Sequence, residues 1–166
     1  MTELAVTVIG PDRTGIVAEV SAALAGVGAN LSDSTMTRLR GHFTMTLICT
    51  GADAAAASAA LSPLAGVLAT VRAVEPSPAA SGGEPYLLSV HGADRLGIVA
   101  AVTREVATAG GNITDLTTRL TGPLYVLVAE VDLPPGAAED LSVRLEHAAG
   151  DLGVEVTLRR AEPDVL

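Results

Sequence analysis

Length, composition and charge narrow the kinds of protein that this chain can be: its 166 residues are 49% hydrophobic and 17% charged, which provides a buried core and argues against intrinsic disorder. A formal net charge of −9, without lysine or tryptophan, argues against direct nucleic-acid binding, because such a surface repels phosphate and offers few rings for base stacking. The lone cysteine, the absence of a signal-peptide pattern and the absence of an apolar run near the roughly 20 residues of a membrane helix predict a cytoplasmic protein without a membrane span.

The first stretch of the chain predicts a strand, a turn and a helix. Apolar side chains alternate over residues 4–8, as they do in a strand, and Gly10-Pro11-Asp12 then breaks the pattern. Over residues 16–27, apolar side chains recur at helical spacing, and Gly28 is suited to end this helix.

Two strands, a second helix and a last strand follow. Residues 30–40 and 43–48 predict a β-hairpin that turns at Gly41. The alanine-rich residues 53–61 favour a helix, and residues 67–75 supply a closing strand. The predicted order is therefore βαββαβ.

The same pattern occurs again 82 positions later. Residues 8–35 align without a gap with residues 90–117, and 14 of these 28 positions are identical. One residue is then expected to be missing from the second copy, so that Arg38 matches Arg119. A gene duplication accounts for this similarity and predicts two domains of one fold.

The second copy predicts the same elements, and a linker precedes it. Apolar side chains recur at helical spacing over residues 98–109 and 141–152, Gly153 stops the second of these helices, and alternation over residues 154–158 gives the last strand. The segment between the copies is rich in proline, glycine and serine, which resist both helix and sheet. The predicted organisation is a first domain over residues 1–75, a linker over residues 76–84 and a second domain over residues 85–166.

A βαββαβ unit of this length indicates the ferredoxin-like α+β fold, in which an antiparallel four-stranded sheet has two helices on one face. The other face stays uncovered. Residues 124–129 are apolar on both faces of their predicted strand. Either this strand exposes a hydrophobic patch that association covers, or it is simply buried in the centre of its own sheet.

The strand–helix turn of each copy is the candidate binding site. The first turn of a helix leaves backbone N–H groups unpaired and has a partial positive charge, so it can hold a carboxylate, and Gly15 and Gly97 leave room for that approach. An aspartate in the turn can meet an ammonium group, and an asparagine that enters the next strand offers both a donor and an acceptor. Together these groups suit a free amino acid.

A structural role competes with this interpretation. Asp12 and Asp94 can cap the helix by accepting hydrogen bonds from its free N–H groups, which stabilises a helix by about 1 kcal/mol. Asn30 and Asn112 can occupy a left-handed turn after the helix. The residues alone leave both interpretations open.

The pattern Gly-x-Asp-Arg-x-Gly-Ile-Val, followed fifteen residues after its second glycine by Asn-(Leu/Ile)-(Ser/Thr)-Asp, resembles the ACT domain in both halves of the chain. Two such domains in a short chain are similar to the glycine cleavage system transcriptional repressor family. The resemblance implies domains that pair side by side and bind amino-acid effectors at their interface through the first strand–helix turn. The implied ligand-binding residues are Asp12, Arg13, Thr14, Gly15, Ile16 and Asn30 in the first copy and Asp94, Arg95, Leu96, Gly97, Ile98 and Asn112 in the second.

Two departures from the family pattern concern these turns. The family often has proline before the turn glycine, where this chain has Thr14 and Leu96. Some amino-acid-binding members have asparagine where this chain has Asp12 and Asp94. The identity of the amino acid therefore does not transfer from the family.

The resemblance implies a homodimer or higher oligomer that senses a small amino acid, needs no cofactor and modulates a transcription factor or an enzyme of amino-acid metabolism. No catalytic motif occurs in the sequence, and the spacing of the three histidines indicates no metal site, so we expect no catalysis. A ligand-free regulator that acts by protein contact alone is the alternative.

Overall fold

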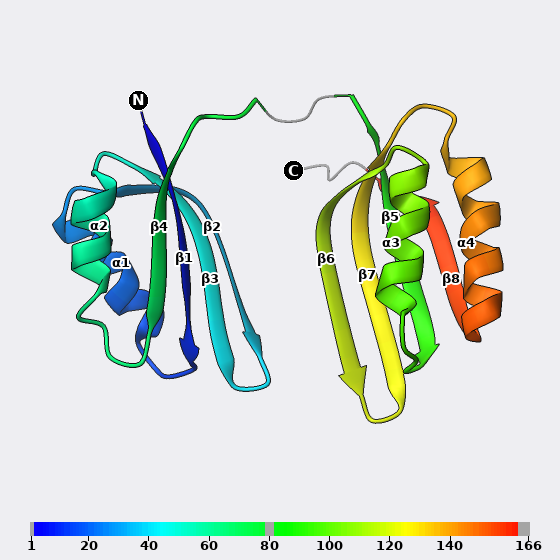
Figure 1. Cartoon of the computed structure of the whole chain (residues 1–166), viewed down its shortest axis with the longest axis horizontal. Helices are drawn as coiled ribbons and strands as arrows, with labels where there is room; N and C mark the ends of the chain where they lie inside the picture. The colour runs from blue at the N-terminus through cyan, green and yellow to red at the C-terminus, as the bar shows by residue number, and fades with distance from the viewer. Residues whose placement is uncertain (1, 79–81, 163–166) are drawn as a thin grey trace. The chain divides into compact units, whose positions relative to one another are not determined.

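The computed structural model describes residues 2–78 and 82–162, and it divides the chain into two compact units, Met1–Pro78 and Ala79–Leu166. Each unit has the order βαββαβ, which confirms the predicted fold (Figure 1). The first unit contains β1 (Glu3–Pro11), α1 (Ile16–Gly26), β2 (Asn30–Leu39), β3 (His42–Thr50), α2 (Ala54–Leu61) and β4 (Leu68–Val74). The second contains β5 (Glu84–Ala93), α3 (Ile98–Thr108), β6 (Asn112–Thr121), β7 (Leu124–Leu133), α4 (Ala138–Leu152) and β8 (Val154–Arg160).

Each unit is built from one antiparallel four-stranded sheet. The strand order is β2-β3-β1-β4 in the first unit and β6-β7-β5-β8 in the second. In Figure 1, α1 and α2 lie on one side of the first sheet, and α3 and α4 lie on one side of the second. The edge strands β2 and β6 each have one side that is not paired with another strand of the same sheet.

A separate core lies between the sheet and the helices of each unit. The alternating residues of β1 and β3 and one stripe of α1 and α2 supply the first core: Leu4, Val6, Val8, Phe43, Met45, Leu47, Cys49, Ile16, Val20, Leu24, Ala57 and Leu61. The second core draws on the matching elements: Leu88, Val90, Leu127, Ala129, Val131, Leu133, Ile98, Val102, Val106, Leu141, Leu145 and Ala149. Because burying one such leucine or valine contributes about 1.5–3 kcal/mol, each unit has its own source of stability.

The hairpins show that the offset of 82 positions between the two copies extends further along the chain than the sequence similarity indicates. A two-residue loop separates Leu39 from its ladder partner His42, and the loop between β6 and β7 also has two residues. The offset of 82 positions therefore continues through the hairpin, and the expected loss of one residue is wrong. The structural counterpart of Arg38 is Leu120, not Arg119, because the ladder register is set by the loop length and not by the similarity of neighbouring residues.

The copies diverge at their second helix. The helix α2 has 8 residues, whereas α4 has 15 and ends at Gly153, whose left-handed φ of 66° confirms the predicted stop. The end of α1 is also close to its prediction, because the helix stops at Gly26 and Gly28 adopts a φ of 82° two residues later.

The strand β7 fits both of the alternatives that its sequence left open. It lies inside its sheet, where Leu127 and Ala129 point into the core and are buried. The alternate residues Leu124, Val126 and Val128 lie on the face that no helix of the unit covers, and Leu124 and Val128 are exposed. The second unit therefore presents apolar surface on its open sheet face.

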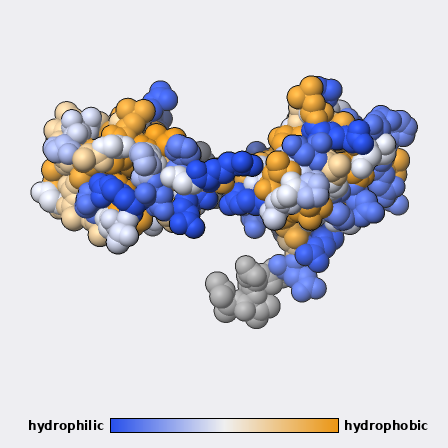
Figure 2. All heavy atoms as spheres, turned by 90° about the horizontal axis from the view of Figure 1, so that it is seen from below, coloured by the Kyte–Doolittle hydropathy of each residue, from blue (hydrophilic) through white to orange (hydrophobic). Residues whose placement is uncertain are grey.

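The open face of the first sheet combines threonines with exposed apolar side chains. Ladder partners share a face, so the residues that alternate with the buried side chains of β1 and β3 can be assigned to the uncovered side. They include the exposed apolar residues Ile9, Leu39 and Leu68 and a set of threonines: Thr7, Thr35, Thr37, Thr44, Thr46, Thr50 and Thr70. Apolar side chains, orange in Figure 2, still reach the surface of both units.

Candidate functional site

Each strand–helix turn ends at a glycine from which the helix begins. Gly15 is the N-cap residue of α1 with a φ of 86°, and Gly97 is the N-cap residue of α3 with a φ of 90°. This left-handed conformation costs a residue with a Cβ about 1–2 kcal/mol, which explains why glycine stands at both positions. Among the described residues, no heavy atom would lie within 4 Å of a Cβ at either glycine, so the space beside each helix start is open.

The first turns of α1 and α3 have backbone N–H groups without an acceptor in the described part of the chain. In α1 these are the amides of Val17 and Ala18, whereas the amide of Ile16 is 3.4 Å from the carbonyl oxygen of Arg13. In α3 they are the amides of residues 98–100. Such amides, together with the positive end of the helix dipole, can receive an anionic group.

The competing interpretation, that Asp12 and Asp94 cap these helices, is wrong. The carboxylate of Asp12 lies 3.3 Å from the guanidinium of Arg38, and the carboxylate of Asp94 makes no hydrogen bond or ion pair within the described residues. Each aspartate stands three residues before the N-cap glycine, too early to reach the first-turn amides as an N-cap side chain does. By contrast, Asp53 caps α2 by accepting a 2.8 Å hydrogen bond from the amide of Ala56.

The remaining contacts of the first turn connect it to α1 and to the hairpin. Arg13 donates two hydrogen bonds to the carboxylate of Glu19, at 2.7 and 2.6 Å. These hydrogen bonds lower the pKa of Glu19. The N–H of Asp12 donates to the carbonyl of Gly41 at 2.9 Å. The first turn is therefore held on two sides by its own unit.

The second turn has none of these three contacts. At the counterpart of Glu19 stands Ala101, and at the counterpart of Arg38 stands Leu120. Within residues 2–78 and 82–162, Asp94 and Arg95 make no hydrogen bond or ion pair through their side chains. The guanidinium of Arg95 lies beside the C-terminal end of α4, where a Cβ on Gly153 would be 3.7 Å from it.

The predicted asparagines lie far from the turn of their own unit. Asn30 pairs with Thr50 at one end of β3, whereas Pro11, the last residue of β1, pairs with His42 at the other end. These eight positions correspond to about 26 Å at about 3.3 Å per residue. The reason is topological: α1 returns the chain to the other end of the sheet before β2 begins. Asn112 and the second turn are separated in the same way.

The other predicted site residues divide between surface and core. Thr14 is exposed and Leu96 is 99% exposed, so both side chains are free for contact with a partner surface. Ile16 and Ile98 are only 4% and 2% exposed, because they are the first core residues of their helices. Of these two residues, only the backbone is placed for a ligand.

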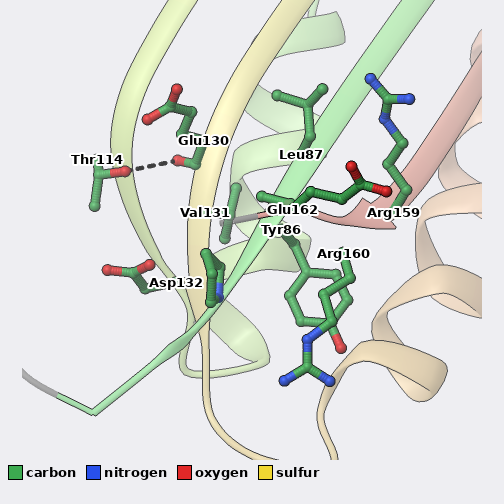
Figure 3. Close-up of a pocket in the computed structure, with 11 residues that line it drawn as sticks. Tyr86, Leu87, Thr114, Glu130, Val131, Asp132, Arg159, Arg160 and Glu162 are labelled. Atoms are coloured by element: carbon green, nitrogen blue, oxygen red, sulfur yellow. Dashed lines mark hydrogen bonds between the residues drawn. The ribbon is translucent and has the colours of Figure 1, made fainter. Parts of the chain in front are cut away.

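One hollow of the second unit lies away from the β5–α3 turn of that unit. It has a volume of about 630 Å³ and lies on the second unit near the start of β5 (Figure 3). Its polar rim includes Glu130, Asp132 and Arg159, and the ring of Tyr86 lies at its side. None of these residues was a predicted site residue, because their alternation with core residues is typical of any sheet face. A smaller hollow of about 250 Å³ includes Asn112 in its wall.

Other kinds of site find little support in the described residues. Within them, no group of three or more histidine, cysteine, aspartate or glutamate side chains is placed to hold a metal ion. Cys49 is buried in the first core, and this burial raises the pKa of its thiol. No helix in the described part of the chain has the length and apolar character that crossing a membrane requires.

The sequence matches a known domain family over most of its length. The model of the ACT domain matches residues 2–70 and 84–159. A UPF0237 protein of Methanococcus maripaludis is 30% identical over 78 residues, which make up 46% of this chain and 87% of that protein. A UPF0237 protein of Streptococcus mutans is 51% identical over 43 residues, which make up 26% of this chain and 49% of that protein. The chain thus spans about half the length of the latter relative.

Two solved structures match nearly the whole chain. One is a protein from Galdieria sulphuraria of unknown function, with 30% identity, a TM-score of 0.83 and coverage of 97% of this chain and 99% of that one. The other is a candidate glycine cleavage system transcriptional repressor, with 17% identity, a TM-score of 0.67 and coverage of 97% and 98%, a likeness that shows the fold. From the two matched segments and the two βαββαβ units, we conclude that this chain belongs to the ACT domain family and contains two ACT domains in tandem.

Proposed function

We propose that this tandem ACT protein is a regulator that senses a small free amino acid. The amino acid binds at an interface between ACT domains, changes how those domains pack and thereby changes how a protein partner is bound. Such a switch requires that the amino acid bind one packing more tightly than the other. The partner that we propose is a transcription factor or an enzyme of amino-acid metabolism.

The observation that carries this proposal is the pair of uncapped helix starts, together with membership in the ACT family. In both units the first-turn amides are free of side-chain caps and open space adjoins the N-cap glycine. A carboxylate at this place would receive charge-assisted hydrogen bonds from backbone amides. An ammonium group on the same molecule would find a carboxylate in Asp12 or Asp94, neither of which is used as a cap.

The proposed site is completed by a second ACT domain. Each turn is an exposed surface, and each asparagine lies about 26 Å from the turn of its own unit. One amino acid can touch both only if the turn of one domain meets the asparagine of another. Twofold antiparallel pairing of two β2 strands, or of two β6 strands, brings opposite ends of the strands together.

Exposed apolar side chains support pairing at these edges. They lie on the edge strand and on the helix that precedes it in each unit: Val17 and Met36 in the first, Val99, Leu116 and Leu120 in the second. A partner domain that paired with the edge strand would remove part of this surface from water, which favours association.

We further propose that the chain acts by binding and not by catalysis. General acid–base chemistry usually relies on ionisable groups whose pKa is shifted by burial or by a close charge. In the described residues, no polar or charged residue is buried, and the ion pairs are exposed or, as between Arg144 and Glu105, half-buried. This environment supports recognition of a ligand more than activation of one.

A thermal-shift screen of the full chain against the twenty free amino acids tests the proposal. An amino acid present at 100 times its dissociation constant stabilises the folded state by about 2.7 kcal/mol, so the melting temperature should rise by several degrees. Asn30→Ala and Asn112→Ala should weaken this response with little change in the free energy of unfolding, because both asparagines are exposed. Thr35→Ala and Thr117→Ala are matched controls on the same strands.

A ligand-free regulator remains the second candidate, and one observation favours it. The open sheet face of the second unit exposes Leu124 and Val128 without any need for a small molecule. If none of the twenty amino acids changes the melting temperature, sensing is wrong and regulation by contact alone becomes the better account. If binding occurs but the asparagine variants bind as the wild type does, the asparagines do not belong to the site.

A further inference from the structure

The charges of the first turn are already satisfied within the first unit. The guanidinium of Arg13 is engaged in a two-pronged pair with Glu19, and the carboxylate of Asp12 faces Arg38. An amino acid that bound here would have to compete with Glu19 for the guanidinium and with Arg38 for the carboxylate. The first turn is therefore poorly prepared to receive a zwitterion.

The second turn keeps the two charged residues but lacks both of their partners. Asp94 and Arg95 correspond to Asp12 and Arg13, while Ala101 and Leu120 stand where Glu19 and Arg38 would be. Two separate substitutions thus have the same effect. They leave a carboxylate and a guanidinium next to each other, without an ion-pair partner among the described residues.

The charges in the first helical turns of α1 and α3 also favour anion binding at α3 over α1. Glu19 places a negative charge in the first turn of α1, which opposes the approach of an anion to the amides there. The first turn of α3 has no acidic residue. The positive end of the α3 dipole is therefore not offset by a side chain of its own first turn, and the amides of residues 98–100 remain favourable to a carboxylate.

From these observations we infer that the two turns are not equivalent, and that the turn of the second unit is the tighter site for a zwitterionic amino acid. The first-turn amides of α3, with the help of Arg95, bind the carboxylate of the amino acid, and Asp94 binds its ammonium group. The first turn serves mainly to hold α1 and the β2–β3 hairpin together. This inference rests on the proposed function, and it adds that Glu19 and its counterpart Ala101 set the difference.

Site-resolved titration of the full ¹⁵N-labelled chain measures the two turns separately. The backbone amides of Val17 and Val99 occupy the same position in α1 and α3, so their chemical shifts report the two helix starts. The probe is whichever of the twenty free amino acids gives the largest thermal shift, beginning with glycine. We expect the dissociation constant read at Val99 to be about fivefold lower than the one read at Val17, because only the first turn must give up an exposed ion pair when it binds the amino acid.

Reciprocal substitutions at Glu19 and Ala101 should change the ratio of the two dissociation constants. Glu19→Ala should lower the dissociation constant at the first turn about fivefold, and Ala101→Glu should raise it at the second turn by a similar factor, because the new carboxylate occupies Arg95. Ala107→Glu adds the same charge at an exposed position farther along α3, and Glu75→Ala removes a charge elsewhere in the first unit. Both controls should leave the two constants unchanged.

The outcomes separate this inference from the proposed function. If no amino acid shifts either amide, the sensing proposal itself fails. If an amino acid shifts both amides with equal constants, or if neither Glu19→Ala nor Ala101→Glu changes the ratio, sensing stands and the inequality of the two turns is wrong. Because Glu19 is exposed, Glu19→Ala keeps the test valid even if a glutamate at the half-buried position 101 disturbs folding.

Discussion

The two units share a backbone frame and differ in the side chains around it. Their β1–α1 and β5–α3 turns both end at a left-handed glycine, and the hairpins that follow keep the same register. Yet the first turn has its charges paired, whereas the charges of the second turn have no ion-pair partner among residues 2–78 and 82–162. The open sheet faces differ as well: the first combines threonines with the exposed Ile9, Leu39 and Leu68, and the second combines Leu124 and Val128 with charged residues that include Glu130, Asp132 and Arg159. Duplication has preserved what the backbone requires, while ion-pair partners and surfaces have diverged.

The largest expected effect tests whether the two units are also energetically separate. Leu24 is fully buried in the first core, so Leu24→Ala should lower the stability of the first unit by about 2–5 kcal/mol. The tyrosines of the chain, Tyr86 and Tyr125, both lie in the second unit. In urea denaturation, circular dichroism should therefore show an earlier transition, while tyrosine fluorescence should keep its wild-type midpoint.

A matched variant in the second unit completes this test. Val106 occupies the position in α3 that Leu24 has in α1, so Val106→Ala should shift the fluorescence transition. Equal shifts of both signals in both variants would mean that the units unfold together, and the account of two independent cores would have to be abandoned.

A smaller effect separates an aspartate that caps a helix from aspartates that do not. Asp53→Ala removes the acceptor of the Ala56 amide and should cost about 1 kcal/mol. Asp94→Ala should change stability by much less, because Asp94 accepts no hydrogen bond from α3 in the described structure. Chemical denaturation of the two variants gives both values. A loss at Asp94 as large as the loss at Asp53 would restore the capping interpretation and weaken the binding proposal.

The smallest effect concerns the ion pair that the first unit has and the second lacks. The hydrogen bonds from Arg13 lower the pKa of Glu19 below the usual pKa of a glutamate. The ion pair therefore stabilises the folded chain at pH values above that usual pKa, and this stabilisation is lost as the pH falls through the lowered pKa of Glu19. Carbon NMR of the Glu19 carboxyl should show this lowered midpoint in the wild type and an ordinary one in Arg13→Gln. An ordinary midpoint in the wild type would show that Glu19 does not occupy Arg13 in solution.

The sequence predicted the fold well because each signal was strong and repeated. Alternation over residues 4–8, helical spacing from Ile16 and two aligned copies all point to one βαββαβ unit, and the structure confirms it. The sequence alone did not determine whether Asp12 caps a helix. An aspartate near a helix start can cap it, and only the position of the N-cap at Gly15 shows that Asp12 stands three residues too early.

The positions of the asparagines and of the hairpin register needed three-dimensional information. The sequence puts Asn30 shortly after α1, but that helix spans the sheet, so the residue lies at the opposite end from the turn. Likewise, the repeated Thr-Arg-Leu segment suggested a missing residue, whereas the ladder aligns Arg38 with Leu120. Local similarity carries no information about which strand positions face each other, because the loop length sets that register.

The claim on which the functional account depends is that the first-turn amides of α3 receive the carboxylate of an amino acid. A crystal structure of the full chain, soaked with the amino acid that gives the largest thermal shift, tests it most directly. We predict that the carboxylate of the bound amino acid lies within hydrogen-bond distance of the amides of Val99 and Ala100 and that its ammonium group lies near Asp94. Density for the amino acid only in the 630 Å³ hollow beside Tyr86, with the α3 amides left to solvent, would contradict the account.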